Sequence, residues 1–473
     1  MVASEASPFA KTGGLADVTS ALPRALGRLG HAVDVVIPRY RGITAGERIA
    51  TIAVRDGDDT ADAAMYAIED GRVRFVFVDR PEYYDREYLY GVGNEDYADN
   101  ASRFAFLARA ALTWGAATDE HYSIVHAHDW QAGLVPVLLG RGAAFGALGD
   151  VPAVFTIHNL AYQGLFDASW LPRLGLDASL LHVDALEFWG RISFLKGGTL
   201  FSRFITTVSP QYAREIQTPA LGFGFDGILR SRSADLVGIL NGIDYDQWDP
   251  ARDRYLSVHY DASRLDGKAM AKRALLEQVG LAAGDGDRRR PLVGLISRMV
   301  DQKGFDLLAD LADELPRLDA SFVLLGTGER RYEDLWRTLA ARHPDRIAVR
   351  IGFDEALAHR IEAGADLFLM PSRFEPCGLN QMYSQRYGTV PVVRATGGLA
   401  DTVRNVDPAT GDGTGFTFTD PSPSALLQAL RRALELYHDR GAWRRIQLAG
   451  MRQDFSWDAS ARQYAGLYER AYN

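Results

Sequence analysis

The chain has 473 residues, which is too long for one ordinary hydrophobic core and predicts two domains of roughly 200 residues or more. Hydrophobic residues make up 47% of it and charged residues 24%, a composition that excludes disorder for the bulk of the chain. The 61 acidic and 52 basic residues give a net charge of −9, which argues against a nucleic acid or an anionic membrane as the general partner.

The sequence carries no sign of membrane insertion or export. No apolar run reaches the roughly 20 residues that a spanning helix needs, and the first residues lack a basic segment followed by a long apolar one. The single cysteine, Cys377, cannot form a disulfide within one chain. We therefore expect a protein of the reducing cytoplasm.

Short apolar runs of strand length alternate with helical periodicity along nearly the whole chain, which is typical of parallel sheets covered by helices on both faces. The strands expected in the first half are Ala32–Ile37, Val73–Val78, Ile124–His128, Ala153–Ile157, Phe204–Val208 and Leu236–Leu240. Those expected in the second half are Leu292–Ile296, Ser321–Leu325, Arg346–Ile351, Asp366–Met370 and Val390–Val393.

Two features of the sequence indicate two related lobes. The segment Asp244–Asp253 has neither period, so we place the domain boundary near residues 242–255. The hexapeptide Thr12–Asp17 recurs with identical residues as Thr396–Asp401, once in each half. The sequence therefore predicts two α/β lobes of the Rossmann-like kind.

Each copy of this hexapeptide places a Gly-Gly pair ahead of helical periodicity. The backbone N–H groups at such a helix start, together with the positive end of the helix dipole, can bind a phosphate, and Lys11 adds a cation to the first copy. The alternative is a tight turn kept only for close packing. We predict anion sites at Gly13, Gly14, Thr396, Gly397 and Gly398.

Two cations, Arg298 and Lys303, follow an apolar strand and precede a helix. At that edge of a sheet they can neutralise a diphosphate, Arg through its planar fork and Lys as a point charge. A solvated surface pair is the alternative.

The loop Pro371–Asn380 follows another strand, and its prolines and glycine indicate a fixed conformation. Glu375 is the first choice for a functional carboxylate, since a carboxylate can bind sugar hydroxyls and stabilise positive charge at an anomeric carbon. A Glu that only caps the next helix is the alternative. We interpret Cys377 as a small buried thiol rather than a nucleophile.

Polar residues also end two strands of the first half, at His126–Trp130 and at His158. Ligands gather at such strand ends in open α/β sheets. No further ligands at suitable spacing accompany the histidines, so we predict no metal site. Asp129 and Trp130 suit a carbohydrate, although a buried structural Trp fits the sequence equally well.

Five of these segments resemble motifs of bacterial glycogen synthases and plant starch synthases, and the resemblance runs in order along essentially the whole chain. The segments are Lys11–Leu15, His126–Trp130, His158–Gly164, Ser372–Gly378 and Thr396–Asp401.

The resemblance implies a retaining glycosyltransferase of the GT-B fold, with two Rossmann-like lobes whose parallel sheets face a deep interdomain cleft. It implies transfer of glucose from ADP-glucose to the non-reducing 4-hydroxyl of an α-1,4-glucan, with no cofactor and no metal. The implied domains are an acceptor lobe at 1–242, a donor lobe at 243–454 and a C-terminal helix at 455–473 that crosses back onto the first lobe.

By the same resemblance, the catalytic residues are Glu375, which binds the glucosyl hydroxyls, Lys11, and His158, whose backbone carbonyl faces the anomeric carbon. Phe353 matches a position that stacks on adenine. The implied donor residues are Lys11, Gly13, Gly14, Asp17, Arg298, Lys303, Phe353, Gly378, Leu379, Asn380, Thr396, Gly397 and Gly398. The implied acceptor residues are Asp129, Trp130 and Asn159.

The chain departs from the family in two places. Only Met1 and Val2 precede Ala3, where family members usually have a full strand of roughly five residues, so we expect a clipped first strand, from a start site assigned too late or in a weakened lobe. Tyr383 stands where the broader fold class often has a second Glu, a position that starch and glycogen synthases commonly change too.

Two alternatives remain open from the sequence. A related retaining transferase would use UDP-glucose, because stacking on Phe353 tolerates either base. A glycan-binding paralogue would have an inactive donor site, although Lys11, Arg298, Lys303 and Glu375 are all present. A nicotinamide oxidoreductase is disfavoured because its glycine fingerprint is missing.

Overall fold

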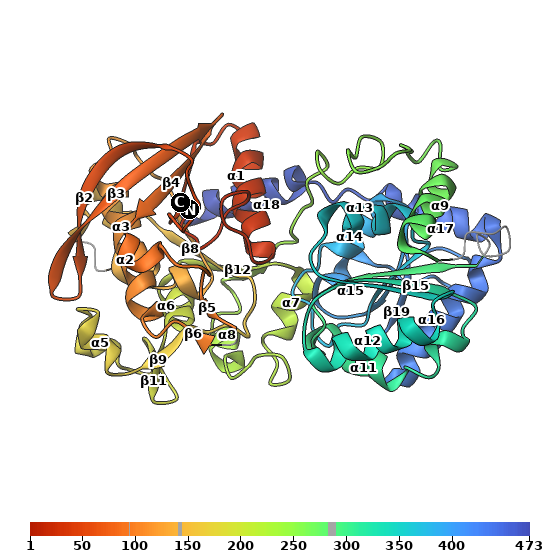
Figure 1. Ribbon diagram of the computed structural model, residues 1–473. Helices are drawn as coiled ribbons and strands as arrows, with labels where there is room; N and C mark the ends of the chain where they lie inside the picture. The colour runs from red at the N-terminus through yellow and green to blue at the C-terminus, as the bar shows by residue number, and fades with distance from the viewer. Residues whose placement is uncertain (94, 141–143, 282–289) are drawn as a thin grey trace. The chain divides into compact units, whose positions relative to one another are not determined.

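The computed structural model describes residues 1–93, 95–140, 144–281 and 290–473. The chain forms two compact units (Figure 1). Unit 1 comprises Met1–Gly242 and Trp457–Asn473, and unit 2 comprises Ile243–Ser456. Each unit is an α/β body with its own sheet and its own hydrophobic core.

The sheet of unit 1 has two parts, with strand orders β1-β4-β3-β2 and β13-β12-β8-β7. The second part is parallel throughout, as its continuous apolar strands predict. Its strands are β7 (Val125–His128), β8 (Ala153–Ile157), β12 (Phe204–Thr207) and β13 (Leu236–Gly238). The first part contains β1 (Val33–Pro38), β2 (Glu47–Asp56), β3 (Asp59–Asp70) and β4 (Val73–Asp79).

The expectation of parallel strands alone is wrong for β2 and β3. They form an antiparallel hairpin, and β3 also pairs antiparallel with β4. Residues of β2 alternate between buried and exposed, which marks a sheet with one solvated face. The two-residue loop Gly57-Asp58 places a glycine, with a φ of 67°, at its first position, which favours such hairpins.

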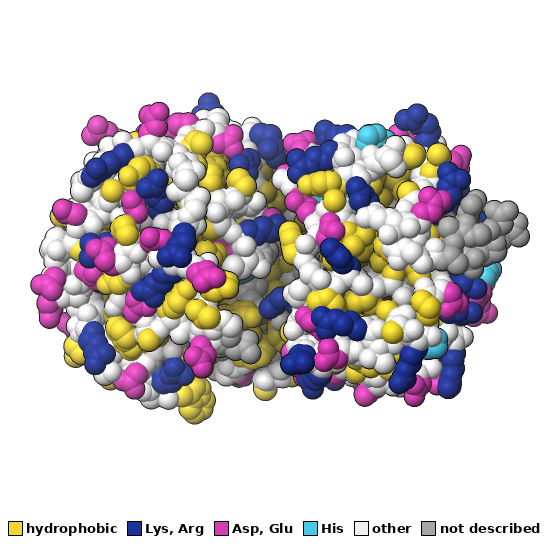
Figure 2. Space-filling model, in the orientation of Figure 1, with side chains coloured by type: hydrophobic (Ala, Val, Ile, Leu, Met, Phe, Trp, Pro, Cys, Tyr) yellow, Lys and Arg dark blue, Asp and Glu magenta, His cyan; other side chains and the backbone are white. Residues whose placement is uncertain are grey.

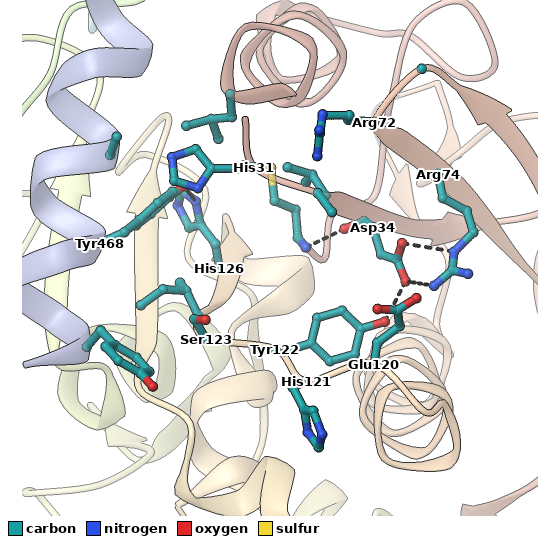
Figure 3. A pocket seen from close by; sticks show the side chains of 18 of the residues that line it. His31, Asp34, Arg72, Arg74, Glu120, His121, Tyr122, Ser123, His126 and Tyr468 are labelled. Atoms are coloured by element: carbon teal, nitrogen blue, oxygen red, sulfur yellow. Dashed lines mark hydrogen bonds and ion pairs between the residues drawn. The ribbon is translucent and has the colours of Figure 1, made fainter. Parts of the chain in front are cut away.

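Val2 joins the two parts of this sheet through isolated bridges to Val36 and Ala127. Beyond it lies a cavity of about 620 Å³, next to Met1 (Figure 3). Asp34, paired with Arg74 and accepting a hydrogen bond from Tyr122, lies on its wall. None of the residues predicted for the donor or acceptor site lines this cavity.

Helices cover the sheet of unit 1, and the C-terminal one closes its core. Helix α18 (Trp457–Tyr472) packs on α1 (Gly14–Arg28), side by side in Figure 1, and buries Trp457, Tyr464 and Leu467. The other helices of unit 1 are α2 (Pro81–Tyr84), α3 (Asn100–Ala117), α4 (Leu134–Leu139), α5 (Trp170–Arg173), α6 (Phe194–Phe201), α7 (Pro210–Glu215) and α8 (Asp226–Ser231). Its short strands are β5 (Gly91–Val92), β6 (Glu95–Asp96), β9 (Leu165–Asp167), β10 (Glu187–Phe188) and β11 (Arg191–Ser193).

Unit 2 has one parallel sheet of six strands in the order β16-β15-β14-β17-β18-β19. The strands are β14 (Leu292–Ile296), β15 (Ser321–Gly326), β16 (Ile347–Ile351), β17 (Leu367–Met370), β18 (Val390–Arg394) and β19 (Phe416–Phe418). Two hydrophobic clusters cover its two faces. One cluster involves α11 (Phe305–Asp310), α12 (Arg330–Arg342), α16 (Pro423–Tyr437) and α17 (Arg440–Met451). The other involves α9 (Gly267–Val279), α13 (Glu355–Gly364) and α15 (Gly397–Thr402).

None of the described helices is long and apolar enough to cross a membrane.

Candidate active site

The order in which the chain adds strands to the sheet of unit 2 reverses between β14 and β17. From β14 the chain adds β15 and β16 on one side, and from β17 it adds β18 and β19 on the other. Ligands of open α/β sheets bind at the carboxyl ends of the strands on either side of such a switch point. The loops that follow β14, β17 and β18 carry Arg298, Lys303, Glu375 and the second Gly-Gly pair.

Glu375 lies in the loop after β17 and forms an ion pair across the switch point. Its Oε2 accepts hydrogen bonds from Lys303 Nζ at 2.6 Å and from Ser372 Oγ at 3.0 Å. The Glu375 side chain is 7% exposed and that of Lys303 is 20% exposed. Two residues predicted separately, one for the sugar and one for the diphosphate, therefore meet in one place.

Three further contacts fix the loops around this pair. Asn380, the first residue of α14 (Asn380–Arg386), donates from Nδ2 to the Ile296 carbonyl at the end of β14, at 2.8 Å. The Arg373 guanidinium pairs with Asp306. Gly304 has a φ of 77°, and a Cβ there would lie 2.1 Å from the Pro371 carbonyl oxygen, so only glycine fits.

The second Gly-Gly pair is required by packing. Gly397 has a φ of 46°, and a Cβ on it would lie 1.9 Å from the Glu375 carbonyl oxygen. A Cβ on Gly398 would lie 2.1 Å from the Cys377 carbonyl oxygen. The hexapeptide that begins at Thr396 thus supports the backbone of the Glu375 loop, which is the packing alternative posed by the sequence.

The first Gly-Gly pair differs, because a Cβ on Gly13 or Gly14 would meet no atom within 4 Å. Both residues are exposed, at the start of the 15-residue helix α1. Packing within the described residues therefore gives no reason for these two glycines, and the space beside the helix start is open to a ligand.

Glu5 holds the Lys11 loop and was missed by sequence reasoning. Its carboxylate accepts hydrogen bonds from Thr12 N at 2.5 Å, from Thr12 Oγ1 at 2.6 Å and from Tyr90 Oη at 2.5 Å. Lys11 Nζ lies 2.6 Å from Asp17 Oδ1, on the exposed side of the same loop. Glu5 lies seven residues before Thr12 in an irregular segment, so no helix or strand period in the sequence indicates their contact.

The ends of β7 and β8 bring three buried histidines together. His126 Nδ1 lies 2.7 Å from Tyr468 Oη, and His128 Nδ1 lies 3.0 Å from His158 Nε2. Burial lowers the pKa of His158 to about 3 and holds those of His126 and His128 well below the ordinary value. All three rings are therefore neutral at pH 7.

Asp129 anchors the backbone of the His158 loop. Its Oδ1 accepts a hydrogen bond from His158 N at 2.7 Å, and its own φ is 56°, in the left-handed region. Burial raises the pKa of Asp129 to about 7. The side chain of Asn159 accepts from Ala161 N at 3.1 Å.

Trp130 lies in the core rather than on a surface. It is 7% exposed, its ring centroid is 5.0 Å from that of Phe104, and Gly164 approaches it so closely that a Cβ there would lie 2.6 Å from the indole. This is the structural Trp that the sequence left open, and the side chain offers little surface for stacking on an acceptor sugar.

The remaining predicted donor residues lie at the same edge of the unit 2 sheet. The Arg298 side chain is exposed after β14, and Phe353, 93% exposed, follows the edge strand β16. Gly378, with a φ of 72°, and Leu379 lead into α14. Tyr383, on α14, stacks on Trp248 with ring centroids 3.9 Å apart.

The described residues contain no group of three or more His, Cys, Asp or Glu side chains that could hold a metal ion.

Comparison with known proteins gives the family. Residues 1–231 match the model of the starch synthase catalytic domain, and residues 285–447 match that of the group 1 glycosyl transferases. A glycogen synthase of Koribacter versatilis is 48% identical over 99% of this chain and 97% of its own length. The chain belongs to the glycogen synthase family. A second glycogen synthase, from an Anaeromyxobacter species, is 52% identical over 99% of this chain and 98% of its own length.

Solved structures agree with membership of the glycogen synthase family. The catalytic domain of starch synthase IV from Arabidopsis thaliana, bound to ADP and acarbose, has a TM-score of 0.91 and 35% identity, covering 100% of this chain and 98% of that one. Sucrose-phosphate synthase from Thermosynechococcus elongatus, at 17% identity and a TM-score of 0.59, shares the fold alone. The expected family and α/β fold class of two Rossmann-like lobes (GT-B) are confirmed, and the protein is a glycosyltransferase.

Proposed function

We propose that this protein is a glycogen synthase that transfers glucose from ADP-glucose to the non-reducing 4-hydroxyl of an α-1,4-glucan, with retention of configuration. The observation that carries the proposal is the Glu375–Lys303 ion pair at the switch point of unit 2, in a chain of the glycogen synthase family. A carboxylate for the glucosyl hydroxyls and a cation for the diphosphate are the two groups that a nucleotide sugar needs side by side.

In the proposed reaction, the bond between the anomeric carbon and the β-phosphate oxygen breaks, and ADP leaves with the bonding electrons. The acceptor O4 bonds to the anomeric carbon and passes its proton to the β-phosphate oxygen of the departing ADP. Lys303 has three N–H donors, so it can hold Glu375 and a phosphate oxygen at once. Arg298 and Lys11 supply further positive charge for the leaving diphosphate.

The neutral state of His158 limits its role. Because burial lowers its pKa to about 3, the ring carries no charge at pH 7. We therefore assign its contribution to the backbone carbonyl, whose dipole can face the positive charge that develops at the anomeric carbon. Asp129 and His128 keep the His158 segment in position.

The test is transfer of labelled glucose to glycogen, with ADP-glucose and UDP-glucose compared at equal concentration and a chelator added in parallel. We expect incorporation from ADP-glucose that the chelator leaves unchanged, and a product whose new linkage is α by NMR. Preference for UDP-glucose would overturn the donor, a β linkage would overturn retention, and no transfer from either donor would overturn the activity.

A further inference from the structure

Exposed aromatic side chains gather on one surface of unit 1, formed by three loops. Trp189, in the turn between β10 and β11, is 81% exposed, Tyr162 is 52% exposed and Phe223 is 40% exposed. We call these three residues the aromatic platform. Figure 2 shows hydrophobic side chains exposed over the region where Figure 1 labels β9, β11 and α8.

The three loops of the platform are joined to one another. A Cβ built on Gly224 would lie 3.5 Å from Trp189 Nε1, so the indole lies against the residue next to Phe223. Gln163 Nε2 donates to the Phe223 carbonyl at 2.9 Å, which joins the Tyr162 loop to the Phe223 loop. The loops that carry the platform are therefore held to one another.

Buried contacts hold the platform from below. The ring of Phe188 packs on that of Phe225, with centroids 4.5 Å apart. The buried Lys196 donates from Nζ to the carbonyls of Val183 and Glu187, and Glu187 Oε1 accepts from Gly190 N at 2.8 Å. Exposed rings on a fixed support lose little conformational freedom when they bind a ligand.

Backbone strain marks the same residues. Trp189 has a φ of 52° and Phe223 a φ of 49°, in a region that bulky residues rarely adopt. Within the described part of the chain, the only other non-glycine residue with a positive φ is Asp129. Residues held in such sparsely populated backbone regions cluster at active sites and ligand sites.

The platform continues from the loop that carries Asn159. Tyr162 N donates to the Asn159 carbonyl at 3.2 Å, and Gly164, just beyond, packs on Trp130. Leu165, which follows this loop, pairs with Ser193 of the β10–β11 hairpin that carries Trp189, so a linear ligand whose end lies at Asn159 can follow the loop toward Trp189. Flat aromatic faces with a polar N–H or O–H at the edge suit the apolar faces and the hydroxyls of pyranose rings.

We propose that the aromatic platform binds the α-1,4-glucan acceptor at glucose units behind its non-reducing end. The proposal rests on the proposed function for the identity of the ligand. The turn that carries Trp189 has Asp184 and Glu187 before it and Arg191 after it, so its local charge does not favour an anionic membrane surface. The platform gives long acceptors an affinity that short ones lack.

The test measures glucan binding without any donor. We compare Trp189→Ala with the wild type in two assays. Native affinity gels measure retention by glycogen, and calorimetry measures the affinity for maltoheptaose. We expect binding about tenfold weaker, largely restored in Trp189→Phe. Tyr472→Ala, which removes a 66%-exposed ring from α18, is the matched control and leaves binding unchanged. Equal melting temperatures show that each variant is folded.

Transfer assays separate this proposal from the proposed function. With Trp189→Ala we expect the KM for maltoheptaose to rise about tenfold, while the KM for maltose changes less than twofold and kcat is kept. A wild type that binds glucan but transfers no glucose contradicts the proposed function alone. If the wild type transfers glucose, and Trp189→Ala binds glucan and transfers glucose equally well, the platform alone is overturned. A wild type that binds no glucan overturns the platform too.

Discussion

Glu375 is the residue on which the proposed chemistry most depends. Glu375→Gln keeps the size of the side chain and removes the charge that faces Lys303. We expect glucose transfer to fall at least about 100-fold, with ADP affinity changed less than about threefold, because in the proposed function the carboxylate binds the glucosyl hydroxyls and not the nucleotide. Steady-state kinetics and ADP titration calorimetry measure the two effects.

The control for this variant is Glu435→Gln, at an exposed position of α16 in the same unit. It should leave both quantities unchanged. If Glu375→Gln transferred glucose within tenfold of the wild type, Glu375 would be a loop-supporting residue only.

The two copies of the hexapeptide should respond differently to the same substitution. A Cβ on Gly398 meets the Cys377 carbonyl oxygen at 2.1 Å, so Gly398→Ala should destabilise unit 2 by about 2 kcal/mol or more. A Cβ on Gly14 meets nothing within 4 Å, so Gly14→Ala should keep the stability and weaken donor binding. Urea unfolding measures the stability of each variant, and ADP-glucose titration measures its donor affinity. Full donor affinity in a stable Gly14→Ala variant would refute a ligand at the first copy.

At the scale of elements, the strand ends of unit 1 should make its stability depend on pH. Histidines whose folded pKa lies below the unfolded value of about 6.5 stabilise the fold above that pH and lose this contribution as the pH falls. The pKa of Asp129 is raised to about 7 in the folded state, against an unfolded value near 4. Between about pH 4 and pH 7 the folded protein therefore binds one more proton at Asp129 than the unfolded chain does, which offsets part of the histidine effect. Because three histidines take up protons on unfolding and only one carboxyl releases a proton, the free energy of unfolding should fall as the pH falls.

The measurement is the free energy of unfolding of unit 1 in urea between pH 6.5 and pH 5. Each histidine contributes up to about 1.4 kcal/mol per pH unit well below pH 6.5. His128→Asn should reduce the slope by about one proton, whereas His121→Asn, at an exposed position, should not. A slope that His128→Asn leaves unchanged would show that this ring does not gain its proton on unfolding.

The cavity beside Met1 should accept a strand. Met1 N donates to the Asp34 carbonyl at 2.6 Å and Val2 N to the His126 carbonyl at 2.8 Å, so parallel register directs the N–H groups of Asp34 and His126 toward the cavity. An apolar Val-Leu-Val segment fused ahead of Met1 should pair with both strands and raise the stability of unit 1 by about 1–3 kcal/mol. Thermal unfolding, with a Gly-Ser-Gly fusion as control, measures this. Equal stability of the two fusions would contradict strand insertion.

Sequence reasoning succeeded where local pattern and tertiary role coincide. The strand Leu292–Ile296 is apolar throughout because helices cover both its faces, so its pattern was sufficient to find it. The β2–β3 hairpin was missed because its solvated face interrupts the apolar run. At the site, Lys303 and Glu375 were found from strand ends, but Glu5 was missed and the burial of Trp130 stayed open, because each depends on contacts distant in the sequence.

At the scale of the whole molecule, the chain returns to unit 1 for its last helix. Trp457, Tyr464 and Leu467 of α18 are buried against Leu22 and Leu26 of α1. A chain that ends at Ser456 loses all of these contacts. Because truncating one buried aromatic side chain costs about 3–5 kcal/mol, the stability lost on deleting the helix should exceed the whole stability of an ordinary domain.

The deletion should unfold unit 1 and leave unit 2 folded. A chain ending at Ser456 should lose the protease resistance of unit 1, while unit 2, whose core involves no residue of α18, should stay folded and keep its affinity for ADP. Tyr464→Ala should lower the free energy of unfolding of unit 1 by about 3–5 kcal/mol, and Tyr472→Ala, at an exposed position of the same helix, should not. Limited proteolysis with mass spectrometry assigns each cut to a unit. If the deletion unfolded both units together, the two would form one cooperative body, and glucan and donor sites would share a single stability.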